Sequence, residues 1–589
     1  MKRYMKYIKP YAFFFIAGPV MMLTEVFGEV WIPKLMSLII DNGIGNHDIA
    51  YVIRIAFVML GACLLMICGG TLGNFFSVKA AVGASADLRS DLFSKVQEFS
   101  FADVDNFSTG SLVTRLTNDL QQIQQLVVTM LKMALRSPGM LVGGFIMALS
   151  VNRDLAIVLL IVIPLLGLSI FFIMKTAYPR FERMQLALDD LNNGIKEVLT
   201  NVRVVKSFVR EEHEKDKFEQ LNSGMMEKSL SAMNVVIFMQ PVMAVFMNLT
   251  SAAVVWFGGN RIIAGEMQVG ELTAFITYIT QILMSLMMLA MVILQSSRAM
   301  ASFKRVSEVL DYEASLTDKD AKEKDRIVRE GSIEFCHVYF EYDSDGILGD
   351  AAGNSDKQVL KDINFSIAPG ETVGILGATG CGKTSLVQLI PRLYDATKGQ
   401  VLVDGVDVRD YSLYNLREGV AMVLQYNTLF SGTVAENLRW GDEDASDEDI
   451  VRFSEYAQAD SFVSTFKGGY DYMIEQGGSN VSGGQKQRLC IARALLKKPR
   501  ILILDDSTSA VDTATERRIN EAFANELKDT TRLIIAQRIG SVKDADKIIV
   551  MDDGRIVDIG NHSELIERCA EYQDIYYSQI EKQKEGTVI

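Results

Sequence analysis

Cysteine is scarce in this chain of 589 residues, and the cysteines present form no structural framework. There are six of them, at Cys63, Cys68, Cys336, Cys381, Cys490 and Cys569. Their spacing matches neither the paired ligands of a zinc site nor the density of a small disulfide-linked domain. We therefore expect reduced thiols that face membrane or cytosol, and we exclude a disulfide scaffold as the basis of the fold.

Basic residues are also in deficit. Lys and Arg together number 59 against 73 Asp and Glu, so the formal net charge at pH 7 is -14. A protein that binds nucleic acid usually carries a basic domain or stripe that neutralises phosphates. The charge balance therefore argues against nucleic acid as a partner.

The N-terminal segment lacks the cleavage site of a signal peptide. It reads "MKRYMKYIKPYAFFFIAGPVMMLTEVF", a basic start and an apolar stretch with no small-residue cleavage motif after it. Without that motif the stretch is not expected to be removed. We interpret it as the first membrane span.

Long apolar stretches fill the first half of the chain. Hydrophobic residues make up 49% of the sequence and the mean hydropathy is +0.17, which is high for a soluble protein. Each stretch approaches the roughly 20 residues that cross a bilayer. They predict about six transmembrane helices, near residues 12–40, 52–80, 130–150, 155–177, 234–260 and 270–298.

The charges in the connecting segments predict the orientation. Lys and Arg gather before the first span, after the second, and between the fourth and fifth, for example at Lys6, Lys95 and Lys206. The other connections are short and nearly free of both residues. By the positive-inside rule, both termini and the second half of the chain are cytoplasmic. We expect a multi-pass protein of the cell (plasma or inner) membrane, with the lipid bilayer as its surroundings.

The composition changes after the sixth span. Residues 311–329 are polar and charged, as expected for a linker, and strands alternate with helices afterwards. We predict a membrane domain over 1–310 and a soluble α/β domain over 330–589. Within the latter, 343–358 is rich in Gly, Asp and Ser and is typical of a surface loop.

A phosphate-binding loop opens the soluble half. "ETVGILGATGCGKTSLVQLI" at 371–390 is an apolar strand, a glycine-rich loop and a helical pattern. Backbone N–H groups of such a loop curl around an anion, and the helix N-terminus favours negative charge. Lys383 can neutralise the outer phosphates, and the Thr384 hydroxyl can bind Mg²⁺. The predicted nucleotide-binding residues of the loop are Gly377, Ala378, Thr379, Gly380, Cys381, Gly382, Lys383, Thr384 and Ser385.

A second motif, which ends in acidic residues, complements the phosphate-binding loop. "ILILDDSTSAVD" at 501–512 is a buried parallel strand that ends in two aspartates. Asp505, at the carboxyl end of that strand, is placed to hold magnesium through water.

Between the two motifs lies "NVSGGQKQRLCIARALL" at 480–496. With this motif the chain resembles an ATP-binding cassette (ABC) exporter half-transporter over nearly its whole length. The resemblance implies a helical polytopic membrane domain of the type I/type IV exporter fold, followed by one α/β P-loop NTPase cassette. It also implies ATP and Mg²⁺ as cofactors.

The resemblance carries further roles to single residues. Ser482, Gly483, Gly484 and Gln485 match the signature motif, which contacts the ATP held by a partner cassette. Tyr342 matches the aromatic residue that stacks on adenine. Gln425 matches the residue that senses magnesium and faces the membrane domain. The segment from Ser509 to Asp512 matches the loop between paired cassettes.

Paired cassettes close head to tail around two ATP molecules in this family. One cassette cannot complete a site, so the resemblance implies a dimer that works by alternating access. ATP drives it through a greater affinity for the closed state.

Two residues depart from the family pattern in the same composite site. Asp506 occupies the position of the glutamate that polarises the attacking water, and a misplacement of about 1 Å can cost about 100-fold in rate. Gln537 occupies the position of a histidine, and it cannot carry a proton at neutral pH. Neutral drift is the alternative. With an intact signature, the pattern resembles the degenerate-site subunit of bacterial heterodimeric multidrug exporters.

The substrate site is less defined. Met243, Met287 and Met291 belong to methionine stripes in the fifth and sixth spans, which line a drug cavity or pack the helices. Glu25 and Glu29 share one face of the first span and are candidates for binding cations, or they face a water-filled vestibule.

Three functions remain open at this stage. The first is ATP-driven efflux of amphipathic small molecules by a heterodimer. The second, in the same broad class, is export of a lipid or peptide, or uptake by a protein with the shape of an exporter. The third is a regulatory ABC subunit that binds ATP with little hydrolysis.

Overall fold

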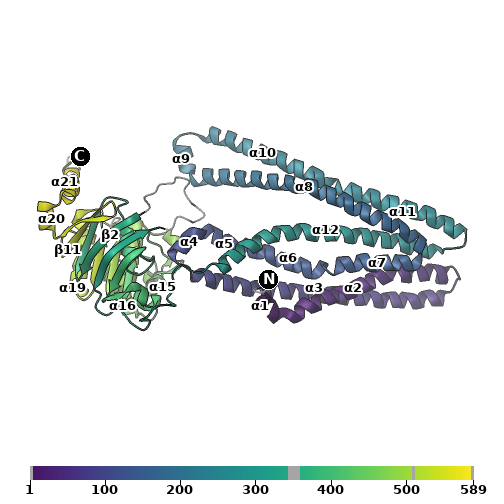
Figure 1. Ribbon diagram of the computed structural model, residues 1–589, viewed down its shortest axis with the longest axis horizontal. Helices are drawn as coiled ribbons and strands as arrows, with labels where there is room; N and C mark the ends of the chain where they lie inside the picture. Colours follow the sequence, from purple (N-terminus) through teal and green to yellow (C-terminus); the bar gives the residue numbers. More distant parts are fainter. Residues whose placement is uncertain (1–3, 343–357, 507–510, 586–589) are drawn as a thin grey trace. The chain divides into compact units, whose positions relative to one another are not determined.

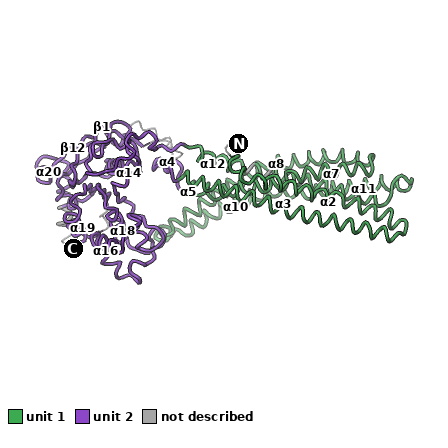
Figure 2. Tube along the Cα trace, turned by 90° about the horizontal axis from the view of Figure 1, so that it is seen from below, with its two compact units in different colours: residues 1–96, 112–312 green, residues 97–111, 313–589 purple. Residues whose placement is uncertain are grey.

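The computed structural model describes residues 4–342, 358–506 and 511–585. The predicted loop at 343–358 and the segment from Ser509 therefore fall largely outside the described residues. Two compact units divide the chain, and Figure 2 colours them separately. Unit 1 comprises Met1–Val96 and Leu112–Tyr312, and unit 2 comprises Gln97–Ser111 and Glu313–Ile589. The domain limits at 310 and 330 stay predictions.

Unit 1 is built from long helices (Figure 1). In chain order its elements are α1 (Met5–Ile8), η1 (Lys9–Tyr11), α2 (Ala12–Leu38), η2 (Ile39–Ile44), α3 (Ile49–Gln97), α5 (Thr109–Thr114), η3 (Arg115–Asp119), α6 (Leu120–Met133), α7 (Arg136–Val151), α8 (Arg153–Thr200), α9 (Val202–Ser207), α10 (Glu211–Ile237), α11 (Met239–Ile263) and α12 (Val269–Asp311). Six helical stretches of the described residues are long and apolar enough to cross a membrane. The predicted six spans are confirmed.

The third span is interrupted. The sequence predicted one helix near 130–150, whereas α6 ends at Met133 and α7 begins at Arg136. Pro138 explains the break, because a proline ring clashes with the carbonyl of the residue four positions earlier, here Ala134. The interruption places Arg136 at the first position of α7.

The core of unit 1 forms where α2, α7, α8, α11 and α12 meet. Phe275, Tyr278 and Ile279 are fully buried there. The Tyr278 hydroxyl donates a hydrogen bond to the carbonyl of Val30 at 3.0 Å. Many other apolar side chains point outward, such as Phe57 at 72% exposure, because a lipid-facing helix does not hide its apolar surface from solvent water.

Unit 2 contains the strands and the shorter helices (Figure 1). Its elements are α4 (Phe101–Phe107), β1 (Ile333–Glu341), β2 (Gln358–Ile367), β3 (Thr372–Gly377), α13 (Lys383–Gln388), β4 (Lys398–Val403), β5 (Val406–Asp407), η4 (Val408–Asp410), α14 (Leu413–Gly419), β6 (Val420–Val423), β7 (Gly432–Thr433), α15 (Val434–Arg439), α16 (Asp447–Tyr456), α17 (Asp460–Val463), η5 (Gly469–Asp471), β8 (Met473–Ile474), η6 (Gln476–Gly478), α18 (Gly483–Leu496), β9 (Ile501–Asp505), α19 (Thr513–Glu526), β10 (Thr531–Ile535), η7 (Ile539–Ser541), β11 (Lys547–Asp552), β12 (Arg555–Gly560), α20 (His562–Arg568) and α21 (Ala570–Glu585).

A six-stranded sheet organises unit 2. Its order is β12-β11-β3-β10-β9-β6, and all neighbours are parallel except β11 and β12. A four-stranded antiparallel sheet, β2-β1-β4-β5, lies in the same unit. The residues of β9 are buried on both faces, as the continuous apolar run "ILIL" predicts for a strand inside a parallel sheet.

Helix α4 belongs to unit 2 although it precedes most of unit 1 in the chain. Its N-terminus has a capping box: the Asp103 backbone N–H donates to the Ser100 hydroxyl, and the Ser100 N–H donates to the Asp103 carboxylate. The carboxylate also accepts from the Ser315 N–H at 3.2 Å. At the other end, the Tyr394 hydroxyl donates to Asp105 at 3.0 Å. These contacts tie α4 to the cassette.

Candidate nucleotide site

The carboxyl ends of four neighbouring parallel strands carry the predicted nucleotide-site residues. The phosphate-binding loop follows β3, Gln537 follows β10, Asp505 ends β9, and Gln425 follows β6. In a parallel sheet all these ends meet at one edge, which is where such folds bind ligands. The topology therefore brings together residues that are up to 160 positions apart in the chain.

Two glycines give the loop its shape. Gly380 and Gly382 have φ values of +89° and +97°, which a side chain would strain. A Cβ on Gly382 would also lie 2.9 Å from the side chain of Leu360. Both positions therefore need glycine, and the loop can present its N–H groups to an anion.

Lys383 closes this loop from within. Its Nζ donates hydrogen bonds to the carbonyls of Gly377 and Ala378 at 2.9 and 2.8 Å. The residue is 9% exposed, so its charge is held against the loop. Neither carbonyl carries a full negative charge, so this ammonium is available for exchange toward a phosphate.

Thr384 and Asp505 meet across the gap between the first helical turn and β9. The Thr384 hydroxyl donates to Asp505 Oδ1 at 3.1 Å. Asp505 is 1% exposed, and its Oδ2 is buried with no hydrogen-bond partner among the described residues. Burial raises the pKa of Asp505 to about 6, with the Asp506 charge adding to the shift. A hydroxyl next to an orphaned carboxylate oxygen suits a hard cation such as Mg²⁺.

Asp506 and Gln537 contact one another. Nε2 of Gln537 donates to Asp506 Oδ2 at 3.2 Å, and Nε2 of Gln487 donates to the Asp506 carbonyl at 3.2 Å. Asp506 adopts φ +48°, an uncommon value for a residue with a side chain. Burial raises the pKa of its carboxyl, against the opposing effect of the Lys383 charge. The two residues that depart from the family pattern thus form a pair.

Tyr342 reaches the same loop from β1. Its hydroxyl and that of Ser385 are 2.8 Å apart, so one donates to the other. Its ring lies edge to face with those of Phe340 and Tyr394, at centroid distances of 4.8 and 5.3 Å. Tyr342 remains 40% exposed, which leaves part of the ring accessible to a planar base.

The predicted signature residues begin helix α18. Ser482 is the N-cap: the Gln485 N–H donates to its hydroxyl at 3.3 Å, and its own N–H donates to Gln485 Oε1 at 2.9 Å. Ser482 and Gly483 are exposed, so the N-terminal N–H groups of a 14-residue helix face outward. Gln425 is also exposed. The start of α18 and Gln425 are thus both accessible at the surface of this unit.

The acidic residues of the first span have a partner that the sequence did not reveal. Arg136 forms ion pairs with Glu25 at 3.2 Å and Glu29 at 3.3 Å. Nε2 of Gln281 donates to the Glu29 carbonyl at 3.1 Å. Glu25 Oε2 and Gln281 Oε1 are buried without a hydrogen-bond partner among the described residues. The three helices α2, α7 and α12 thus share one polar cluster.

The methionines divide between two environments. Met243 packs against the core of unit 1 and Met287 is partly buried, whereas Met291 is 53% exposed. Core packing therefore accounts for Met243, and Met291 points outward.

Comparisons with known proteins identify the family. Residues 14–286 match the family model "ABC transporter transmembrane region", and residues 360–509 match "ABC transporter". The uncharacterized ABC transporter ATP-binding protein YfiB of Bacillus subtilis is 38% identical over 581 residues, covering 98% of each chain. The chain belongs to the ABC transporter family. It is an ATP-hydrolysing exporter half-transporter, with one transmembrane region and one cassette, and a multi-pass membrane protein.

A second relative by sequence and one solved structure are also similar to this ABC transporter. YgaD of Bacillus subtilis, named as a candidate multidrug export ATP-binding/permease protein, is 32% identical over 587 residues and matches 98% of this chain and 99% of its own. The structure of a bacterial Atm1-family ABC exporter with ATP bound has a TM-score of 0.80 at 23% identity, covering 96% of this chain and 98% of that one. The latter likeness supports the exporter fold.

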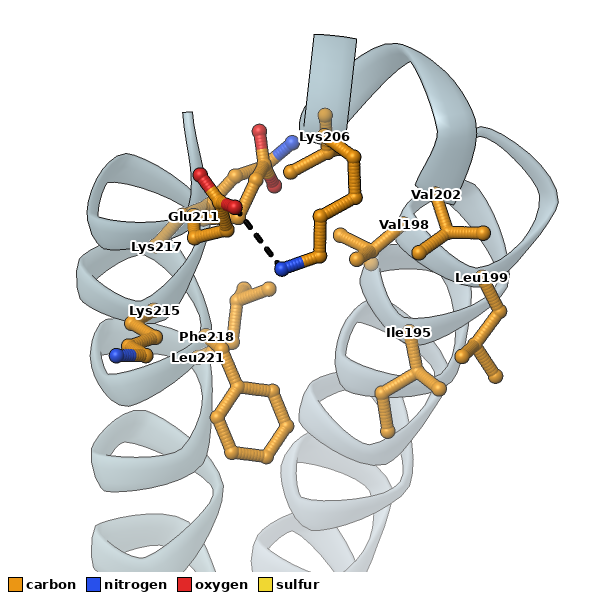
Figure 3. Close-up of a pocket in the computed structure, with 13 residues that line it drawn as sticks. Ile195, Val198, Leu199, Val202, Lys206, Glu211, Lys215, Lys217, Phe218 and Leu221 are labelled. Atoms are coloured by element: carbon orange, nitrogen blue, oxygen red, sulfur yellow. Dashed lines mark hydrogen bonds and ion pairs between the residues drawn. The ribbon is translucent and has the colours of Figure 1, made fainter. Parts of the chain in front are cut away.

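A cavity of about 360 Å³ lies where α8, α9 and α10 of the transporter meet (Figure 3). Its interior is apolar, with Ile195, Leu199 and Phe218 among the lining residues. Lys206 and Glu211 pair across its mouth at 2.9 Å. On the short helix α9 and just after it, Val204, Phe208 and Val209 are 54%, 73% and 80% exposed. These side chains form an apolar tip that is exposed among the described residues of unit 1.

Several contact residues were missed from the sequence. Arg136 could have been found, because it is a charged residue inside an apolar span just before a proline. Tyr394 carries no such signal, because an isolated tyrosine is common on any surface.

Proposed function

We propose that this chain is the degenerate-site half of a heterodimeric ABC exporter that moves amphipathic small molecules out of the cell by alternating access. The observation that carries the proposal is the contact between Asp506 and Gln537 in a site whose other parts fit a nucleotide. We further propose that both termini and the cassette are cytoplasmic, as the positive-inside rule predicts from the charges of the connecting segments.

The residues of the loop would hold ATP with Mg²⁺. Lys383 exchanges its two carbonyl partners for phosphate oxygens, and the N–H groups between Gly380 and Lys383 surround the anion. Bound Mg²⁺ supplies positive charge that offsets charge developing on the transferred phosphate. Thr384 and Asp505 would contact the ion, directly or through water. Gln425 follows β6, the neighbour of β9 in the sheet, and we expect it to join them.

Slow hydrolysis follows from the two unusual side chains. A general base must reach the attacking water, and Asp506 is one methylene shorter than glutamate. Its Oδ2 also accepts a hydrogen bond from Gln537, which occupies an oxygen that could otherwise face the attacking water. Gln537 can donate a hydrogen bond but cannot titrate near neutral pH. The site is therefore suited to bind ATP for a long time and to hydrolyse it slowly.

The intact signature supports a fast site elsewhere. Ser482, Gly483 and Gln485 present an exposed, well-capped helix N-terminus that would face ATP on a partner's loop. The exposed apolar residues at α9 give the partner a second surface. A partner with glutamate and histidine at the positions of Asp506 and Gln537 would complete the efficient site.

The polar cluster in the membrane domain supports a cationic preference. Helix α7 has 16 residues and so extends about 24 Å, less than the roughly 30 Å of the hydrocarbon layer. With Val151 at the predicted outer boundary of the bilayer, we place the first residue of α7, Arg136, within that layer. Among the described residues, two carboxylates face one guanidinium, and a cationic group can neutralise the second carboxylate. Relatedness to YgaD is consistent with drug-like substrates.

The experiment that tests the proposal is isolation of the tagged chain from its native membrane. A second, different ABC half-transporter should co-purify in equal amount and raise ATP hydrolysis well above that of this chain alone. Recovery of only this chain, as a homodimer with full ATPase activity, would refute the heterodimer. Transport of a cationic dye and a neutral dye into inverted vesicles then tests the substrate class. Glu25→Gln and Glu29→Gln should reduce transport of the cation alone.

The same pair of residues favours one alternative, a regulatory subunit whose ATP is bound without productive hydrolysis. In that case a faster site would impair transport instead of improving it. Lipid or peptide export remains the other alternative, and the vesicle assay separates it from dye export.

A further inference from the structure

The last helix of the chain contacts the loop that carries Gln537. Gln579 of α21 bridges this loop with both ends of its side-chain amide. Its Nε2 donates to the Gln537 carbonyl at 2.8 Å, and its Oε1 accepts from the Ile539 N–H at 3.0 Å. One amide thus holds the backbone on either side of Arg538.

This bridge is continuous with the degenerate pair. The backbone that Gln579 holds carries the Gln537 side chain, which donates to Asp506 at 3.2 Å. Ile539 is 4% exposed and begins η7, so the far end of the loop is fixed by packing. The direction of the Gln537 side chain therefore depends on a residue 42 positions later in the chain.

Helix α21 is itself anchored in the core. Tyr572 is fully buried, and its hydroxyl lies 2.7 Å from Nδ1 of His562 at the start of α20. Burial raises the pKa of Tyr572 to about 12, so the phenol remains neutral. Ile575 and Tyr576 pack against the same core cluster. These positions anchor the first half of α21, and Gln579 contacts the loop one turn later, near the middle of the helix.

The position of Gln579 is unexpected for packing alone. Tyr572, Ile575, Tyr576 and Gln579 follow the spacing i, i+3, i+4, i+7, which places them on one face of a helix. The first three are apolar or aromatic and bury that face, whereas the fourth is an amide. An amide on a packed face, with both its groups used on one loop, indicates a specific backbone contact.

We propose that Gln579 is a positioning residue: α21 holds the loop so that Gln537 lies against Asp506, and this sets how fast the site turns over its ATP. The inference rests on the proposed nucleotide site. Release of the bridge would let the loop, and Gln537 with it, adopt other conformations. Any partner or segment that moves α21 would then regulate the site through the backbone.

The test uses the full-length chain with the subunit that co-purifies with it. Gln579→Ala removes both hydrogen bonds, whereas Gln579→Glu keeps the acceptor for Ile539 and loses the donor to Gln537. Gln573→Ala is the matched control, because Gln573 lies on the same helix and donates to the Ile566 carbonyl, outside the loop. ATP affinity, and vanadate trapping of photoactive ATP on this chain, are measured for each variant.

The expected result is a change of about fivefold or more in the trapping rate for Gln579→Ala, with ATP affinity within about twofold of wild type. The trapping rate of Gln579→Glu should lie between those of Gln579→Ala and wild type. The trapping rate of Gln573→Ala should match wild type. Hydrogen exchange at the Ile539 amide should accelerate about tenfold in Gln579→Ala, which reports the bridge even if trapping is weak.

Equal trapping rates in Gln579→Ala and wild type, with normal ATP binding, would overturn the inference. Unchanged exchange at Ile539 would overturn it as well. A wild-type chain that fails to bind ATP would instead refute the nucleotide site on which the inference depends, so the two failures are distinct.

Discussion

Nε2 of Gln537 donates a hydrogen bond to the Asp506 carboxylate at 3.2 Å, so the two side chains that depart from the family pattern are direct partners. Residues in contact are energetically coupled. A change at one position therefore alters the environment of the other. The pair acts as one unit in the site, so the effect of a substitution at Asp506 depends on the residue at position 537.

Restoring the family residues should accelerate this site. The double variant Asp506→Glu with Gln537→His is expected to raise ATP turnover on this chain by about 10- to 100-fold, because the longer carboxylate reaches the water. Vanadate trapping on this chain measures it, and Lys383→Ala is the control without productive nucleotide binding. The single variants should be non-additive by about 0.5–3 kcal/mol. No gain in the double variant would contradict the proposed slow site, and faster turnover with lost transport would favour a regulatory subunit.

Magnesium binding should weaken in acid through Asp505. Its pKa of about 6 lies above the ordinary value of 3.8, so below about pH 6 the carboxyl is protonated and cannot serve as an anionic ligand. Protons compete with the metal, so affinity should fall about tenfold per pH unit below 6 and level off above it. Mg²⁺ titration of the ATP-loaded chain measures this.

The control for this pH dependence is Asp505→Asn, which has no proton to lose. The Mg²⁺ affinity of this variant still depends on the protonation of ATP itself, which affects the variant and the wild-type chain equally. The ratio of the two affinities should change across pH 5 to 7. A constant ratio would show that Asp505 does not bind the metal as its carboxylate.

Arg136 should stabilise the membrane domain by pairing two carboxylates. The side chains of Glu25 and Glu29 are 18% and 29% exposed, so Arg136→Ala leaves two half-buried charges without a cation. The expected loss is about 2 kcal/mol, below the 3–5 kcal/mol for a fully buried pair. Thermal unfolding in detergent measures it.

Arg261→Ala is the matched control for this ion pair, since Arg261 pairs with Asp154, whose side chain is 63% exposed. It should cost less than about 1 kcal/mol. Adding Glu29→Gln to Arg136→Ala should recover part of the loss. Equal destabilisation by the two arginine variants would argue against a special role for the cluster.

Tyr394 should hold α4 to the cassette. Its hydroxyl donates to Asp105, and burial raises the pKa of Tyr394, so the donor proton is retained at neutral pH. Tyr394→Phe removes only this hydrogen bond to a charged acceptor, typically about 1.5–3 kcal/mol. Hydrogen exchange over α4 should accelerate about tenfold.

Tyr411→Phe provides the comparison for this variant. Its hydroxyl donates to the Val403 carbonyl inside the cassette, away from α4. Exchange over α4 should be unchanged in that variant. If Tyr394→Phe behaves in the same way, other contacts of α4, such as those of Asp103, hold the helix.

The sequence by itself determined the six spans, the strand-loop-helix around Lys383, the buried strand that ends at Asp505 and the motif that begins at Ser482. These depend on local periodicity and on motifs whose members are a few residues apart, so the chain's own order specifies them. The break at Ala134 is also local in origin, since Pro138 causes it. It was missed because the apolar stretch continues through it.

Only the tertiary structure decided which side chains meet. Asp506 and Gln537 are 31 positions apart, Gln537 and Gln579 are 42 apart, and Arg136 is 107 from Glu29. Parallel strand order brings the first pair to one sheet edge, and the packing of α21 and of the membrane helices brings the others together. Such contacts depend on long-range packing, which no local pattern encodes. They determine the positions of the side chains in the nucleotide site and in the polar cluster of the membrane domain.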